Sequence, residues 1–377
     1  MRILFVGSGS SATVYALAPL ATAARNSGHE VFMAAHAQAM PAVVGVGLPA
    51  VPLTERPLWE FIGKDRSGRE LTLPTDPAEG GPFAGRAFAR MAAANFGPLI
   101  DLAHDWRPDL VVGGTMSYAA GLLGARLGIP VVRQAWDISD ADTIHPGADE
   151  ELRPELREMG LDRLPEPDLL IDICPPALRP PGAPPAQLMR WRPGNQQQIL
   201  EPWMYARGDR PRVCLTSGSR ASLRGHDNSF TFLRDMAKTI GALDVELVVA
   251  APEDIAAELR AESPAIRSGW FPLDVVAPTT DLMIHHGGGV TMMTAMNAGV
   301  PQLVLPNGPL AIPTSRRLSA QGSALTLVPG QDSPRDTAAA AERILGDASF
   351  RRSARVLARE IAGLPLPSDV VRELERL

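Results

Sequence analysis

The sequence predicts an α/β protein made of two Rossmann-like halves, each with a parallel sheet between helices. Short apolar runs that end in glycine turns alternate with segments of helix length, which is typical of doubly wound sheets. This pattern opens the chain and starts again after a proline-rich stretch over 175–212. The length of 377 residues also fits two domains of ordinary size.

The first half opens as strand, glycine turn, helix and strand. Residues 3–6 are continuously apolar, as expected of a central strand buried on both faces, and the turn occupies 7–11. Apolar residues then recur at helical spacing up to Gly28, a residue typical of a helix C-cap. We expect the strands of this half over 3–6, 30–34, 110–112 and 130–134.

Two stretches carry no regular periodicity. Residues 54–85 are rich in proline, glycine and charge, and we expect a long functional or mobile loop there. Residues 175–212 are dense in proline, which removes a backbone donor, so we expect a connector rather than sheet or helix.

The second half repeats the pattern of the first. We expect strands over 212–216, 245–250, 281–285 and 302–305, with helices over 230–240 and 290–298. The last segment, 353–377, is amphipathic and is expected to pack across the domains. The expected domains are 1–202 and 203–359, with a final helix over about 360–377 that packs back on the first.

Composition excludes several classes of protein. The net charge of −6 comes without a block of Lys and Arg, so no nucleic acid is expected as a partner. Two cysteines make neither a disulfide scaffold nor a metal cluster. No signal segment or membrane span is visible, and we expect a cytoplasmic protein. The oligomeric state is not encoded in any motif, and a homodimer is only a guess.

The first glycine turn matches part of a dinucleotide-binding motif. Gly7, Gly9 and Ala12 have the spacing of the fingerprint, which also requires a carboxylate about 20 residues further on for the ribose. The residues at 34–37 are Ala-Ala-His-Ala, so NAD is the last of the alternatives. A tight turn that lets the helix pack on the sheet explains these glycines well.

A stronger motif lies between a strand and a helix at 284–291, Ile-His-His-Gly-Gly-Gly-Val-Thr. Three glycines allow a ligand to approach the backbone closely. The helix that begins after them presents unpaired N–H groups with partial positive charge. This combination favours an anion such as a diphosphate. His286 and Thr291 are candidate donors, whereas we expect His285 to be structural, because adjacent strand residues point to opposite faces.

Together with further motifs that occur in the order found in the family, this motif makes the chain resemble the nucleotide-diphosphosugar glycosyltransferases of GT-B fold. The similarity covers essentially the whole chain and is greatest to the deoxysugar transferases that decorate aromatic polyketides in actinomycetes. The residues that carry it are Pro19-Leu20-Ala21, Gly28-His29-Glu30-Val31, Gly269-Trp270 before Pro272-Leu273, His286-Gly287-Gly288 and Gly299-Val300-Pro301-Gln302.

The resemblance implies two Rossmann-like domains that face each other across a cleft, with the acceptor in the first domain and the donor in the second. Trp270 would stack on the nucleobase, and the glycine turn would hold the diphosphate. The donor is a dTDP-sugar that acts as co-substrate, with no cofactor and no metal. The donor-binding residues implied are Ser10, Ser217, Ser219, Arg220, Trp270, Pro272, Leu273, His286, Gly287, Gly288, Gly289, Val290 and Thr291.

Two departures from the family pattern bear on the reaction. Many members have a histidine as general base where this chain has Thr13, and threonine cannot take a proton near neutral pH. Many members also carry an Asp-Gln pair for the sugar hydroxyls, and this chain has Leu310 and Ala311 there. An apolar sugar pocket suits a deoxygenated sugar, because unpaired buried polar groups are costly.

The segment 136–147 resembles the subset of these enzymes that attach sugar to an aromatic carbon. In that interpretation Asp137 is the catalytic residue, which removes or holds a phenolic proton of the acceptor. A helix N-cap or turn is the alternative for Asp137. Asp140 and Asp142 also spell a metal-binding Asp-x-Asp, but three residues match by chance too easily, and we expect no metal.

We therefore predict an inverting, metal-independent hexosyltransferase that moves a 2,6-dideoxyhexose from dTDP to a carbon of an aromatic polyketide in antibiotic biosynthesis. The alternatives are an O-glycosyltransferase on a similar acceptor, a sugar-nucleotide epimerase and a catalytically silent partner protein that binds a sugar nucleotide. The long segment 54–85, interpreted as an acceptor wall, counts against the epimerase.

Overall fold

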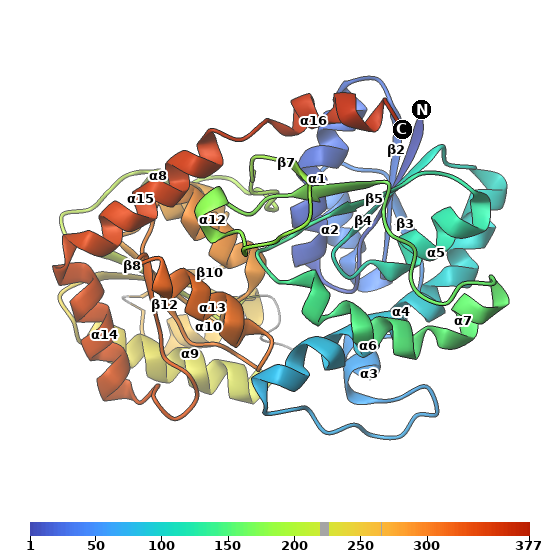
Figure 1. Ribbon diagram of the computed structural model, residues 1–377. Helices are drawn as coiled ribbons and strands as arrows, with labels where there is room; N and C mark the ends of the chain where they lie inside the picture. The colour runs from blue at the N-terminus through green and yellow to red at the C-terminus, as the bar shows by residue number, and fades with distance from the viewer. Residues whose placement is uncertain (219–225, 265) are drawn as a thin grey trace. The chain divides into compact units, whose positions relative to one another are not determined.

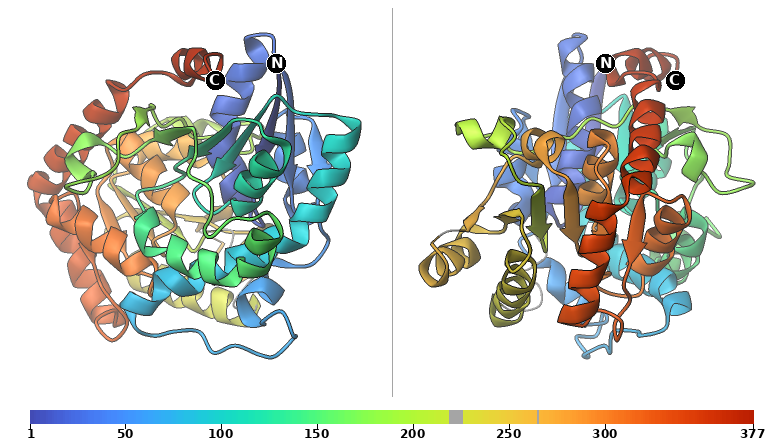
Figure 2. Two further views of the ribbon diagram at one scale, coloured as in Figure 1. Left: turned by 45° about the vertical axis from the view of Figure 1, so that its right-hand side comes forward. Right: turned by 90° about the vertical axis from the view of Figure 1, so that its left-hand side faces the viewer.

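The computed structural model describes residues 1–218, 226–264 and 266–377, which divide into two compact units (Figure 1). The N-terminal unit comprises Met1–Cys174, Arg179–Gly194 and Leu364–Leu377. The C-terminal unit comprises Pro175–Leu178 and Asn195–Gly363. Figure 2 shows the strands of each unit as a layer with helices on its faces.

The N-terminal unit is built on a parallel seven-stranded sheet in the order β3-β2-β1-β4-β5-β6-β7. Ile3 to Val6 of the central strand are at most 1% exposed, as the continuous apolar run predicts. The strands are β1 (Arg2–Val6), β2 (Glu30–Ala35), β3 (Ala50–Pro52), β4 (Leu110–Gly114), β5 (Val131–Gln134), β6 (Leu169–Asp172) and β7 (Gln187–Leu188).

Helices cover both faces of this sheet, and Gly28 follows the first of them with a φ of +95°. The helices are α1 (Ser11–Asn26), α2 (Met40–Gly45), α3 (Leu58–Gly63), α4 (Pro77–Asp105), α5 (Tyr118–Leu127), α6 (His145–Glu151), α7 (Arg153–Glu158) and α16 (Pro367–Leu374).

The expected long loop at 54–85 is wrong, because α3 and the first turns of α4 lie within it. Glycine in α4 makes room for a neighbouring helix there instead of breaking the helix. A Cβ on Gly81 would lie 2.5 Å from the Thr143 carbonyl oxygen, and one on Gly85 would lie 2.1 Å from the Ile144 carbonyl oxygen. The glycines therefore let α4 pack closely against the chain that leads into α6.

The C-terminal unit repeats the same order of strands. Its described residues form a parallel six-stranded sheet in the order β10-β9-β8-β11-β12-β13. The strands are β8 (Arg212–Thr216), β9 (Glu246–Ala250), β10 (Arg267–Gly269), β11 (Leu282–His285), β12 (Gln302–Val304) and β13 (Ala324–Thr326). The helices are α8 (Pro202–Tyr205), α9 (His226–Gly241), α10 (Glu253–Glu262), α11 (Leu273–Val276), α12 (Gly289–Ala298), α13 (Ala311–Ala320), α14 (Pro334–Gly346) and α15 (Ala348–Ala362).

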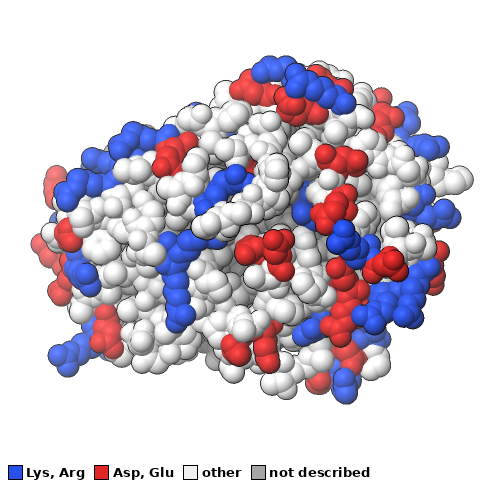
Figure 3. Space-filling view, in the orientation of Figure 1, with Lys and Arg blue, Asp and Glu red and all other residues white. Residues whose placement is uncertain are grey.

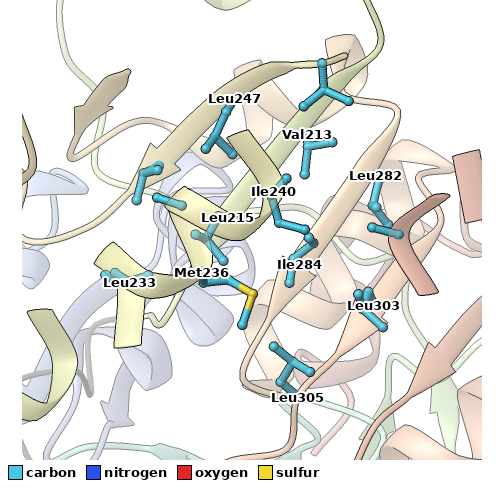
Figure 4. Close-up of a cluster of buried hydrophobic side chains, with 14 of the residues drawn as sticks. Val213, Leu215, Leu233, Met236, Ile240, Leu247, Leu282, Ile284, Leu303 and Leu305 are labelled. Carbon is cyan, nitrogen blue, oxygen red and sulfur yellow. The ribbon is translucent and has the colours of Figure 1, made fainter. Parts of the chain in front are cut away.

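Alternation along these strands builds a core on each face of the sheet. Val213 and Leu215 belong to the cluster that packs under α9, whereas Cys214 between them belongs to the cluster on the other face. Figure 4 shows the first cluster, with Met236 and Ile240 of α9 directed at the strands. Buried strands with both faces covered are what parallel sheets require.

The proline-rich stretch at 175–212 is a connector only in part. Two of its residues, Gln187–Leu188, form β7 and pair with β6, and Pro202–Tyr205 form α8. The expectation that this stretch contains neither sheet nor helix is therefore wrong at these two places. Pro185 stands two residues before β7 and Pro202 is the first residue of α8, positions where a missing N–H is tolerated.

The end of the chain contributes to both units. Helix α15 packs against α12 in the C-terminal unit, and α16 packs against α1 in the N-terminal unit. Val370, Val371 and Leu374 of α16 are at most 1% exposed.

Acidic and basic side chains are interspersed over the face of each unit that Figure 3 displays. Within the described ranges, no helix is long and apolar enough to cross a membrane.

Candidate functional site

The predicted donor residues lie at the carboxyl ends of β8 and β11, which are neighbouring strands at the centre of the C-terminal sheet. From β8 the chain continues to β9 and β10 on one side, and from β11 it continues to β12 and β13 on the other side. Ligands of doubly wound sheets bind at such a switch point in the strand order. The turn at Ser217-Gly218 follows β8, and the turn at His286-Gly287-Gly288 follows β11.

The imidazole of His286 lies between two glycines. A Cβ on Gly218 would lie 2.3 Å from His286 Cε1, and one on Gly288 would lie 2.5 Å from His286 Nε2. Gly218 also has a φ of +69°, in the left-handed region that favours glycine. The absence of a Cβ at both glycines therefore leaves the space that the His286 ring occupies. The ring lies between the turn after β8 and the turn after β11.

His285 is structural, as the alternation of strand residues predicts. Its side chain is 1% exposed, and its Nε2 lies 2.8 Å from the side-chain oxygen Oε1 of Gln302. The backbone N–H of Gly287 donates to Nδ1 at 3.1 Å, so Nε2 carries the proton and donates to Gln302. Burial lowers the pKa of His285 to about 4, so the ring is neutral at pH 7 and fixes the start of the turn.

The amino end of α12 has the features of an anion site. Gly288 is its N-cap, and no side chain in the described residues caps it. Gly289, Val290 and Thr291 are partly exposed, whereas the next five residues of the helix are buried. The free first-turn N–H groups and the helix dipole together favour a negatively charged ligand. Beside this end, the Oγ of Ser217 is buried without a hydrogen-bond partner in the structure.

One of the two predicted sugar-pocket residues, Ala311, lies against the same turn. Leu310 precedes α13 and Ala311 begins it. A Cβ on Gly287 would lie 2.9 Å from the Ala311 Cβ, so the two residues are in direct contact. The Asn307 N–H donates to the His286 carbonyl oxygen at 2.9 Å, which ties the chain before α13 to the turn.

Trp270 follows the edge strand β10 and is partly exposed. It is not among the buried core residues, so its ring is accessible to a ligand. Pro272 is the buried N-cap of α11, and Leu273 packs on the core under α12. Ser219 and Arg220, also predicted as donor residues, lie outside the described residues.

In the N-terminal unit, Ser10 is the N-cap residue of α1 and is partly exposed. Thr13 has a structural role, because its hydroxyl donates to the Ser10 carbonyl oxygen at 2.8 Å and accepts the Ser8 N–H at 3.1 Å. The side chain of Thr13 is 5% exposed and holds the turn that carries Ser10. The first glycine turn is also packed, since a Cβ on Gly9 would lie 3.0 Å from Leu58. This contact favours the tight-turn interpretation over a dinucleotide site.

Asp137 lies just beyond β5 and is partly exposed. Its Oδ1 accepts the Ser139 N–H at 2.8 Å, which is the turn interaction that the alternative interpretation predicts. Asp140 makes the same kind of bond to the Asp142 N–H at 3.1 Å. Among residues 1–218, 226–264 and 266–377, no three His, Cys, Asp or Glu side chains are grouped to hold a metal ion.

One polar cluster was not among the predicted site residues. Arg133 of β5, Tyr118 of α5 and His145 of α6 lie together in the N-terminal unit. The signal for it in the sequence is an arginine inside the apolar strand run at 130–134.

Comparisons with known proteins agree with this architecture over the whole chain. Residues 86–218 match the family described as erythromycin biosynthesis protein CIII-like, N-terminal domain, and residues 234–377 match the C-terminal domain of the same description. The chain is 32% identical to the L-demethylnoviosyl transferase of Streptomyces niveus, over 99% of this chain and 97% of that protein. It is 30% identical to the 10-deoxymethynolide desosaminyltransferase of Streptomyces venezuelae, over 100% and 97%.

Solved structures are similar over the same length. The glycosyltransferase SsfS6 of Streptomyces sp. SF2575, complexed with thymidine diphosphate, has a TM-score of 0.88 and 33% identity, with all of both chains covered. The spinosyn rhamnosyltransferase SpnG, complexed with spinosyn aglycone, has a TM-score of 0.84 and 28% identity, again with all of both chains covered.

Proposed function

Because the chain belongs to the erythromycin biosynthesis protein CIII-like family of GT-B glycosyltransferases, we propose that it transfers a 2,6-dideoxyhexose from a dTDP-sugar to an aromatic polyketide. The relatives are named for transfer of sugars in Streptomyces, and a solved neighbour holds thymidine diphosphate. The observation that carries the proposal is the His286 turn at the amino end of α12, at the switch point of the C-terminal sheet. The protein's own residues suffice for this proposal, which invokes no cofactor and no metal. A homodimer stays a prediction.

In this proposal the diphosphate binds the N–H groups of Gly289, Val290 and Thr291. These groups and the His286 ring stabilise the negative charge that grows on the leaving diphosphate. Trp270 stacks on the thymine ring. Ala311 against Gly287, with Leu310 beside it, leaves an apolar wall for a sugar that lacks hydroxyls.

We further propose that the new bond is a carbon–carbon bond. Asp137 takes the proton of an acceptor phenol, and the phenolate raises the electron density at the ortho carbon. This carbon attacks the anomeric carbon as the bond to the diphosphate oxygen breaks and its electron pair leaves with dTDP. The resulting dienone then loses the proton of the ortho carbon to solvent water, which restores the aromatic phenolate, and Asp137 returns its proton to the phenolate oxygen. A single displacement inverts the anomeric configuration. The bound hydroxyl of Thr13 supports this choice, since the position that the resemblance assigns to a general base holds a structural side chain.

Acid hydrolysis of the product distinguishes this reaction from its alternative. A C-glycoside survives acid that removes an O-linked deoxysugar, so we expect the sugar to remain on the aglycone. Release of the sugar would assign the protein to O-glycosylation and overturn the carbon–carbon bond.

Asp137→Asn tests the proposed base with little disturbance of the turn. The amide oxygen of asparagine can still accept the Ser139 N–H, but it cannot take a proton. We expect kcat to fall by about 10²-fold or more, in the range that general bases contribute. Asp140→Asn, which keeps the equivalent bond to the Asp142 N–H, is the matched control and should retain parental kcat. Near-parental turnover of Asp137→Asn would remove Asp137 from the role.

A further inference from the structure

A pocket in the N-terminal unit is lined by none of the residues that the proposed function uses. It is bordered by the carboxyl end of β4, the strand β5, the first turns of α5 and the segment before β6 (elements in Figure 1). The enclosed space between these elements is about 40 Å³ and opens to solvent on one side. That is room for about three water molecules or for a small polar group such as a carboxylate, with the rest of a ligand at the open mouth.

The polar side chains of this pocket are one cation and three hydroxyls. Among the described residues that line it, Arg133 alone is charged, and Thr115, Ser117 and Tyr118 contribute the hydroxyls. The Arg133 Nε, the Ser117 Oγ and the Tyr118 OH are all buried and have no hydrogen-bond partner in the structure. Buried polar atoms of folded proteins are almost always hydrogen-bonded. Three such atoms at one pocket indicate a ligand that forms the hydrogen bonds they lack.

The charge of Arg133 is only weakly compensated. Its nearest carboxylate is that of Glu166, 3.9 Å away on a side chain that is 71% exposed. Its Nη1 lies 3.5 Å from the His145 Nδ1, at the outer limit of a hydrogen bond. Burial and the Arg133 charge lower the pKa of His145, which therefore stays neutral at pH 7 and orients the guanidinium without competing for an anion.

The hydroxyls of Ser117 and Tyr118 act as donors beside this cation. Burial raises the pKa of Tyr118, so its phenol is protonated at neutral pH. Tyr118 is 6% and Ser117 is 8% exposed. Ser117 is the N-cap of α5 but its side chain makes no capping bond, so its hydroxyl and the amino end of the helix are available to the same ligand.

We propose that this pocket binds a carboxylate carried on an apolar body. The guanidinium of Arg133 provides the charged contact for the carboxylate, and Ser117 and Tyr118 provide neutral donors. Apart from Thr115, the remaining side chains of the lining are apolar, with Val131, Leu164 and Pro165 among them, which suits a ring or short chain better than a heavily hydrated polyanion. The carboxylate belongs either to the acceptor or to a free organic acid that binds beside it.

Binding of benzoate to the purified protein, followed by calorimetry or ligand-observed NMR, tests the proposal without any transferase assay. We expect saturable binding in the millimolar range, at least tenfold weaker for benzamide, which has the same shape and no charge. Arg133→Gln should weaken benzoate binding at least tenfold, Arg133→Lys less, and Tyr118→Phe several-fold. Arg126→Gln, at an exposed position of the same helix α5, is the matched control and should bind as the parent does.

Equal affinity of Arg133→Gln and the parent, or no saturable binding of benzoate, would overturn the proposal. A folded Arg133→Lys variant that retains binding excludes a loss caused by misfolding of Arg133→Gln. Competition between benzoate and acceptor in the transfer assay would assign the carboxylate to the acceptor. Binding without competition would assign it to a free acid. Benzoate binding is measured without the sugar donor and without turnover. A loss of benzoate binding therefore contradicts the pocket proposal alone, and a lack of sugar transfer contradicts the proposed function alone.

Discussion

Adjacent residues at the end of β11 have different roles because the strand alternates its side chains. His285 points into the core and is held by Gln302 and the Gly287 N–H, whereas His286 lies over the glycine turns. The sequence predicts this division from the alternation of strand residues alone. It does not predict that Gly218, some 70 residues earlier, makes room for the His286 ring, because that contact depends on the pairing of β8 with β11.

The buried His285 makes the stability of the protein depend on pH. Its pKa is about 4 in the folded chain and returns to 6.5 on unfolding, so the unfolded chain binds more protons between these values. Stability from this residue is complete above pH 6.5 and is lost as the pH falls toward 4. His285→Gln should reduce the slope of unfolding free energy against pH in this window by up to about 1.4 kcal/mol per pH unit.

Denaturant unfolding at several pH values between about 7 and 4.5 measures that slope. His104→Gln is the control, because the side chain of His104 is 88% exposed. An unchanged slope in His285→Gln would contradict the assignment of His285 as a buried neutral ring. His36, also buried with a pKa of about 4, contributes further loss in the same window.

At the scale of elements, the parallel strands and their turns are the part that the sequence predicts best. Continuous apolar runs followed by glycine identify the strands around the switch points, and each lies within a residue or two of its expected position. Helix α4 is missed because glycine and proline are typical of loops. In α4 they serve a contact with distant residues, the chain into α6, and local pattern does not reveal such a partner.

Gly288→Ala tests whether glycine is required at this position to leave room for the His286 ring or to allow the backbone conformation of the turn. Gly288 has a φ of −65°, which alanine adopts without strain, but a Cβ there would lie 2.5 Å from the His286 Nε2. The ring must move, and we expect the affinity for dTDP to fall about tenfold or more, which corresponds to about 1.4 kcal/mol. Calorimetric titration measures it.

Gly346→Ala at the end of α14 is the matched control, because an added Cβ meets no atom within 4 Å. It should bind dTDP as the parent does. Parental affinity in Gly288→Ala would show that the position of the His286 ring does not matter for the nucleotide.

At the scale of the whole molecule, the last residues of the chain complete the first unit. Leu374 of α16 is fully buried, and its helix packs against α1. Leu374→Ala leaves a cavity and should lower the free energy of unfolding of the N-terminal unit by about 2–4 kcal/mol. Hydrogen–deuterium exchange should show faster exchange in α1, with β8 and β11 unchanged.

Leu377→Ala is the control for this substitution, since Leu377 is 44% exposed and should tolerate truncation. Equal exchange of α1 in Leu374→Ala and the parent would mean that the N-terminal unit does not depend on α16. The sequence predicts that the terminal segment is amphipathic. The partner of each part depends on the fold, with α15 on α12 and α16 on α1.

The central claim is that the His286 turn binds the diphosphate of a dTDP-sugar, and calorimetric titration with dTDP tests it most directly. We predict that dTDP binds, that UDP binds more weakly and NAD not at all, and that His286→Ala loses about tenfold or more in dTDP affinity. His104→Ala, an exposed histidine in the N-terminal unit, should leave the affinity unchanged. Absence of dTDP binding, or parental affinity in His286→Ala, would contradict the claim.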